Sequence, residues 1–212
     1  MKTTFLIIIA LTSASSVLAD GDNFDKSAGA PSGWASTMTG SGQPRWTVEK
    51  DATAPSKPNV LKQSGEADYP LLLKDNTSLK DGFVEVKFKA VSGSEDQAGG
   101  VIWRAKDKDN YYICRANALE GNVVLYKTEN GKRKSVDIVG RKGGYGVKEP
   151  VAPQQWHTLR VDFTGDIFTV KLNGKELFKV QDSTFPDAGM VGLWTKADSV
   201  TLFDDFEYAA AK

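Results

Sequence analysis

The side chains that could do chemistry gather in residues 99–139, where Arg and Tyr occupy mid-strand positions that Lys usually takes on a solvent-facing strand. Arg and Asn supply planar hydrogen-bonding groups and Tyr supplies a ring face, a mixture that suits sugar hydroxyls and apolar sugar rings. An ordinary solvated face, with the same residues kept for solubility, is the competing interpretation. We expect a saccharide-binding surface that contains Arg104, Tyr111, Arg115, Asn117, Tyr126 and Asp137.

Two later residues extend this predicted surface. In the run from Met190 to Lys196, strand alternation turns Val191 and Leu193 inward. Trp194 and Lys196 then face the other way, and an indole outside the core favours stacking against a sugar ring. Packing of Trp194 under a loop is the competing interpretation.

No catalytic acid motif accompanies these residues. Glycoside hydrolysis usually needs two carboxylates at a defined separation, and the strand motif Glu-x-Asp-x-x-Glu of sandwich glucanases is missing. Asp205 and Glu207 share a strand face near the chain end, which is typical of a solvated terminal strand. A structural calcium site, with Asp205 and N-terminal loop oxygens including Asp25, is the alternative. We expect no other cofactor, because zinc spacings, phosphate loops and dinucleotide fingerprints are missing.

The single histidine and the single cysteine favour structural roles. His157 shares strand parity with Leu159 and Val161, so it points toward the core or its rim. Cys114 lies mid-strand between apolar neighbours, which is typical of a small core residue rather than a nucleophile.

Short strands position all of these residues, since period-two patterns dominate and no long stretch has helical periodicity. Many short antiparallel strands separated by Gly and Asn turns indicate a two-sheet antiparallel jelly-roll sandwich, an all-β fold. Residues 20–82 are less regular and are predicted to form edge strands and long loops. The other strands are expected at about 83–90, 99–105, 111–117, 122–128, 132–139, 156–163, 167–172, 176–181, 189–196 and 199–208.

Two Asn-Gly pairs, Asn130-Gly131 and Asn173-Gly174, predict type I′ hairpins and thereby fix the strand register. Pairing outward from these turns, and from a predicted loop at 106–109, produces one aliphatic face and one polar face. The predicted pairs are Arg104/Tyr111, Trp103/Tyr112, Val101/Cys114, Cys114/Leu125, Ala116/Val123, Val124/Asp137 and Val123/Ile138. Tyr112 is therefore expected in the core.

The beginning of the chain predicts export. Lys2, an apolar run from Phe5 to Leu11 and the small residues that end at Ala19 indicate a signal peptide over 1–19, followed by a single domain over 20–212. Its removal leaves 26 Lys and Arg against 27 Asp and Glu. A near-neutral chain argues against nucleic-acid binding and electrostatic membrane attachment, and no later segment could insert into a membrane. We expect a periplasmic or secreted protein.

Several segments resemble a known family. Residues 98–112 with Arg115 and Asn117, the run Trp156-His-Thr-Leu-Arg-Val161, and Val191–Trp194 followed by Phe203-Asp-Asp-Phe206 are similar to 3-keto-disaccharide hydrolase-type and laminin-G-like domains. The resemblance implies a concanavalin A-like fold and, by the family name, hydrolysis of oxidised disaccharides. It assigns no catalytic acid or base to a residue here.

Three functions follow from these observations. The first is a sugar-binding module with an oligosaccharide or glycan partner. The second is a keto-sugar hydrolase that recruits acids from loops, such as Glu95, Asp96 or Glu149. The third is an envelope domain that binds another protein. For the first, Arg115→Ala is expected to weaken binding with little change in melting temperature, since an open-face charge contributes little to folding.

Overall fold

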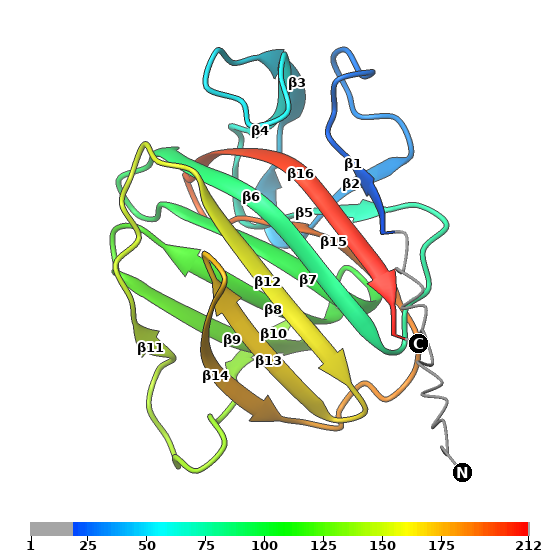
Figure 1. The fold of residues 1–212 in the computed structure, drawn as a ribbon, viewed down its shortest axis with the longest axis vertical. Helices are drawn as coiled ribbons and strands as arrows, with labels where there is room; N and C mark the ends of the chain where they lie inside the picture. The colour runs from blue at the N-terminus through cyan, green and yellow to red at the C-terminus, as the bar shows by residue number, and fades with distance from the viewer. Residues whose placement is uncertain (1–18, 212) are drawn as a thin grey trace, which may run out of the picture.

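The computed structural model describes residues 19–211, so most of the predicted signal segment lies outside the described residues. Within that range the regular structure consists of β-strands, and no helix that could span a membrane is found. The strands form two antiparallel eight-stranded sheets, which lie one behind the other in Figure 1. This confirms the predicted two-sheet antiparallel sandwich.

Sheet A has the order β14-β13-β12-β6-β16-β4-β3, with β1 paired to β16. Its strands are β1 (Asp20–Asp22), β3 (Trp46–Lys50), β4 (Asn59–Gln63), β6 (Gly82–Ser92), β12 (His157–Thr164), β13 (Ile167–Leu172), β14 (Lys175–Gln181) and β16 (Val200–Ala210).

Sheet B has the order β10-β9-β8-β7-β15-β5-β2, with β11 paired to β9. Its strands are β2 (Trp34–Gln43), β5 (Glu66–Lys74), β7 (Ala98–Asp107), β8 (Asn110–Asn117), β9 (Asn122–Glu129), β10 (Lys132–Ser135), β11 (Val147–Lys148) and β15 (Met190–Trp194).

The core between the sheets follows from strand alternation. On β6, Val84, Val86 and Phe88 are buried in the shared core, and the residues between them point out of the sandwich. Cys114 and Tyr112 lie in the same core, as the register predicted. The predicted pairs Val101/Cys114, Trp103/Tyr112, Cys114/Leu125 and Ala116/Val123 are all confirmed.

The two Asn-Gly hairpins are also confirmed. Asn130 and Gly131 have φ of 50° and 74°, and Asn173 and Gly174 have φ of 51° and 79°. Both positions of a type I′ turn need this left-handed backbone, which Asn and Gly adopt at least cost. The flanking pair Glu129/Lys132 has the predicted register.

Sheet B curls toward the side that faces away from sheet A, and we call this side the concave face. The hydroxyl of Thr39 on β2 donates to the carbonyl of Lys108, in the turn between β7 and β8, at 2.5 Å. Three strands separate β2 from β8 in the sheet order, so this contact closes the curl. A second apolar cluster is therefore buried on the concave face, formed by Leu71, Leu73, Ala98, Ile102, Ala105, Tyr111, Ile113, Val124, Tyr126 and Trp194.

Candidate functional site

The concave face carries most of the predicted binding residues, as strand parity required. Tyr111, Arg115, Asn117, Tyr126 and Trp194 all lie on it, opposite the residues of the main core. The expectation that this face is open to solvent was wrong. Each of these side chains is at most 2% exposed, because the curl of sheet B folds the face in on itself.

Arg115 is the centre of a buried polar network at one end of this face. Its Nη2 donates to Glu120 Oε2 at 2.9 Å, to Tyr145 Oη at 3.1 Å and to Tyr126 Oη at 3.2 Å, and its Nη1 donates to Asn122 Oδ1. Burial alone would lower the pKa of Arg115, but the neighbouring Tyr126 and Glu120 raise it overall. The guanidinium is therefore a fixed positive charge.

Asn117 joins this network to a second carboxylate. Its Nδ2 donates to Asp96 Oδ1 at 2.5 Å and to Glu120 Oε1 at 3.3 Å. Asp96, which is 1% exposed, also accepts a hydrogen bond from Lys196 Nζ. A continuous polar chain thus runs from Lys196 through Asp96, Asn117 and Glu120 to Arg115, and we call it the polar chain.

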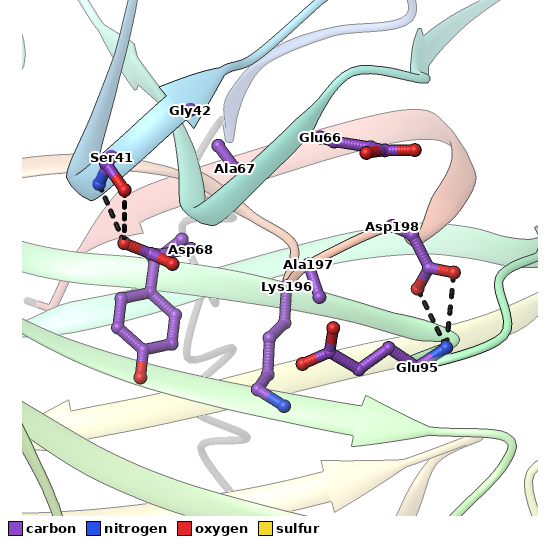
Figure 2. A pocket seen from close by; sticks show the side chains of 10 residues that line it. Ser41, Gly42, Glu66, Ala67, Asp68, Glu95, Lys196, Ala197 and Asp198 are labelled. Carbon is purple, nitrogen blue, oxygen red and sulfur yellow. Dashed lines mark hydrogen bonds between the residues drawn. The ribbon is translucent and has the colours of Figure 1, made fainter.

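A pocket of about 370 Å³ opens beside the Lys196 end of the polar chain. Figure 2 shows Ser41 and Asp68 on one side of it and Glu95 with Asp198 on the other, with Lys196 between them. Asp68 accepts hydrogen bonds from the backbone amide and hydroxyl of Ser41, at 2.8 and 3.0 Å. These bonds lower the pKa of Asp68, so its carboxylate is ionised at neutral pH.

An aromatic wall connects the pocket with the interior of the concave face. Tyr69 lines the pocket and stacks on Trp194, with ring centroids 5.8 Å apart and planes 17° apart. The guanidinium of Arg133 lies over the same two rings and over Tyr126. The site therefore combines stacked aromatic rings, buried amides and charged groups beside one pocket.

A family model for the 3-keto-alpha-glucoside-1,2-lyase-like domain matches residues 15–207. The chain belongs to this family. No match was found among curated protein sequences.

Solved structures share the fold of this 3-keto-alpha-glucoside-1,2-lyase-like domain. The carbohydrate binding module CBM66 from Bacillus subtilis superposes with a TM-score of 0.66 at 21% identity, covering 84% of this chain and 96% of its own. The cellulose induced protein Cip1 has a TM-score of 0.63 at 14% identity, with 91% and 98% covered. A Bacillus licheniformis β-glucanase has a TM-score of 0.55 at 12% identity, with 92% and 98% covered. At these identities the likeness shows the fold, which is concanavalin A-like.

Arg104 is not on the concave face, contrary to the prediction. The β7–β8 register shifts after Trp103, and Arg104 has a left-handed φ of 48°. The resulting β-bulge turns the side chain toward the end of the sandwich, where it lies over Phe163 and Phe168. There it donates to the carbonyls of Lys80, Gly165 and Phe185 and pairs with Asp81. This network ties loops together and does not contribute to the pocket.

Asp137 also departs from its predicted position. Strand β10 ends at Ser135, so the predicted pairs Val124/Asp137 and Val123/Ile138 do not form. Instead Ile138 bridges to Val180 of sheet A, and Val147 of β11 takes the place beside Val123. Asp137 is exposed, in a loop next to β14, and lies outside the polar chain.

The residues predicted for calcium have protein partners. Asp25 accepts hydrogen bonds from Asn23 Nδ2 and from the amide of Asn59, and Asp205 pairs with Lys87 Nζ at 2.7 Å. In residues 19–211, no group of three His, Cys, Asp or Glu side chains could hold a metal ion. Calcium binding stays a prediction.

His157 has the structural position that its parity predicted. Its Nε2 lies 2.9 Å from the carbonyl of Ala152 and its Nδ1 lies 3.1 Å from Asn173 Nδ2. A ring that donates at Nε2 and accepts at Nδ1 satisfies both contacts, so His157 links two loops at the edge of the core.

Sequence reasoning missed several residues of the site in this family member. Glu120 and Tyr145 come from loops, and Tyr69 comes from β5, whose place beside the site depends on the curl of sheet B. Arg133 is different, because pairing outward from the Asn130-Gly131 turn predicts it opposite Thr128 on this face, and the structure confirms that pair. Asp96 was considered only as a loop acid of the hydrolase hypothesis. The one local signal is the spacing of Glu120, three residues after Asn117 in a short hairpin turn, which returns it toward the same strand end.

Proposed function

We propose that this chain is an exported carbohydrate-binding β-sandwich whose ligand occupies the pocket between Tyr69 and Lys196. The observation that carries the proposal is the juxtaposition of that pocket with a stacked aromatic pair and with the polar chain. A sugar presents hydroxyl groups and apolar ring faces together, so a binding pocket needs both kinds of group close to each other.

The fold supports this proposal by analogy. Two structural relatives, a carbohydrate binding module and a β-glucanase, have names that state carbohydrate as their ligand or substrate. Fold likeness alone does not assign a function, so the pocket chemistry carries the argument. The signal-like sequence over 1–19 supports export, and polysaccharides are common ligands of exported proteins.

A second candidate function is hydrolysis or lyase chemistry on oxidised disaccharides, which the family's name suggests. Asp96 and Glu120 bond the same amide nitrogen of Asn117, so their oxygens lie within about 6 Å of each other. Retaining glycosidases place two carboxyl groups about 5 Å apart. Burial would raise the pKa of Glu120, but hydrogen bonds from Asn122 and the charge of Arg115 lower it, so Glu120 would serve as a base or nucleophile.

A glycan-array screen tests the first function, with the chain from residue 20 onward, with and without calcium. We expect a defined sugar hit that Tyr69→Ala and Lys196→Ala each weaken by about tenfold, which corresponds to one stacking contact or one charged hydrogen bond. Lys179→Ala is the matched control, because Lys179 is exposed on sheet A away from the pocket.

If sugar binding is unchanged in both pocket variants, the binding site lies elsewhere on the molecule. A blank array together with turnover of a 3-keto-disaccharide, lost in Glu120→Gln, would favour the catalytic function instead.

A further inference from the structure

Arg133 differs from the other arginines that lie against aromatic rings. Arg104, Arg115 and Arg160 each pair with a carboxylate, at 3.2, 2.9 and 2.6 Å. Among residues 19–211, Arg133 has no such ion pair, and its Nη1 is buried without a hydrogen-bond partner. An arginine cannot lose its proton in a protein, so this is an uncompensated positive charge.

Aromatic rings fix the position of this guanidinium. Its central carbon lies 4.3 Å from the ring centroid of Tyr126, 4.7 Å from that of Tyr69 and 5.5 Å from that of Trp194. The rings attract the cation through their π faces but accept no in-plane hydrogen bond. The five N–H donors of the guanidinium lie in its plane, so the rings do not satisfy them, and the buried Nη1 has no other partner.

Arg133 contacts a residue that lines the proposed ligand pocket. Tyr69, over which Arg133 lies, lines the pocket. Lys196, the cation that lines the pocket, is already paired with Asp96. Arg133 thus lies behind the Tyr69 wall of the pocket and has no ion pair in the described part of the chain.

The acidic groups at the pocket do not supply a counter-charge for Arg133. Asp68 and Asp198 remain ionised, but the hydrogen bonds from Ser41 and from the loop at 93–97 hold their carboxylates there, and neither pairs with Arg133 in the described residues. Glu66 and Glu95 are exposed, where water and salt weaken their effect on a ligand inside the pocket.

We propose that Arg133 binds a carboxylate of the saccharide, so that the site prefers oligosaccharides that contain uronic acid. The proposal rests on the proposed carbohydrate-binding function and names its ligand class. A carboxylate matches the forked donor geometry of a guanidinium and can accept two parallel hydrogen bonds, which a sugar hydroxyl cannot.

Paired probes test this inference by calorimetry on the purified protein. The probes are oligogalacturonate and oligoglucuronate, each compared with its own methyl ester, which keeps the sugar and removes the charge. We expect the acid form of at least one probe to bind about tenfold or more tightly than its ester, the effect of one charge-assisted bidentate contact. The preference should shrink in 0.5 M salt.

Variants locate the preference on this residue. Arg133→Gln should bind acid and ester equally, and Arg133→Lys should keep only part of the preference because an ammonium lacks the fork. Arg141→Gln is the matched control, because Arg141 is an exposed arginine in the loop after β10. Circular dichroism and the melting temperature show whether each variant is folded.

The outcomes separate this inference from the proposed function. Equal affinity of the unmodified protein for acid and ester, or a preference that persists in folded Arg133→Gln, overturns the role of Arg133. Binding of neutral glycans only on the array overturns it as well but leaves the carbohydrate-binding function standing. If no sugar of either kind binds, both proposals fail.

Discussion

The outer face of sheet A and the concave face of sheet B are both built from alternating strands, yet they bury their polar residues to different extents. On sheet A, Arg160 pairs with Asp162 at 2.6 Å and Lys171 pairs with Asp162 at 2.9 Å, and all three side chains remain about a third exposed. On sheet B, Arg115 is 1% exposed and contacts a glutamate, an asparagine and two tyrosines.

The difference comes from curvature rather than from composition. Sheet A presents its outer face to water, so its ion pairs are screened and contribute little to stability. Sheet B folds its far face around Trp194 and Tyr111, so polar groups there must find protein partners or remain unsatisfied. Polar groups that lack a protein partner on a buried face therefore indicate a ligand, whereas ion pairs on an exposed face indicate a contribution to solubility.

The largest expected effect is that of Trp194→Ala. Trp194 is fully buried in the concave cluster, and removal of a buried Trp side chain typically lowers the free energy of unfolding by about 3 to 5 kcal/mol. Trp156→Ala is the control, because Trp156 is half-buried beside Lys89 on sheet A and should cost about 1 kcal/mol. Urea unfolding measures both, and equal losses would mean that the concave face is not a second core.

Arg115→Met is expected to have the next largest effect. It leaves the buried oxygens of Tyr126 and Asn122 without their donor, and an unsatisfied buried polar group costs about 1 to 3 kcal/mol. This replaces the expectation of an unchanged melting temperature, which assumed an open face. Arg160→Met on sheet A should cost less than about 1 kcal/mol. Thermal unfolding of the two variants side by side decides whether the two faces differ as described.

The sequence predicted the features that depend on residues close together along the chain. The left-handed turns at Asn130-Gly131 and Asn173-Gly174, and the parity that separates Cys114 from Arg115, are local properties that Asn, Gly and alternation encode. The confirmed jelly-roll fold follows from repeating that pattern along the chain.

The remaining features depend on contacts between distant segments. Arg104 adopts a left-handed conformation that its residue type does not predict, because the bulge is stabilised by carbonyls 24 or more residues away along the chain. The curl of sheet B depends on Thr39 meeting Lys108 and Tyr111. The polar chain needs Asp96 from one loop and Glu120 from another, and pairing of strands does not predict where loop side chains lie.

The smallest expected effect is a pH dependence of stability that comes from one residue of the pocket. Burial would raise the pKa of Asp198, but hydrogen bonds from the backbone of Ser94, Glu95 and Asp96 hold it far below its ordinary value of 3.8. A lowered folded-state pKa contributes stability above pH 4, and that contribution is lost as the pH falls toward the folded-state value. For so accessible a group it should stay below about 1 kcal/mol.

Asp198→Asn tests this through the loop that carries Asp96. The melting temperature of the variant should lie below that of the unmodified protein by a constant amount from pH 5 to pH 8, and the gap should narrow steadily as the pH falls below 4 toward the folded-state pKa of Asp198. The matched control is Asp166→Asn in the turn between β12 and β13, where the gap should be small because, among residues 19–211, the Asp166 side chain accepts a hydrogen bond from Gln181 alone. A gap that stays constant down to pH 2 would show that the Asp198 carboxylate does not hold the 93–97 loop, and the pocket wall would then depend on Lys196 and Asp96 alone.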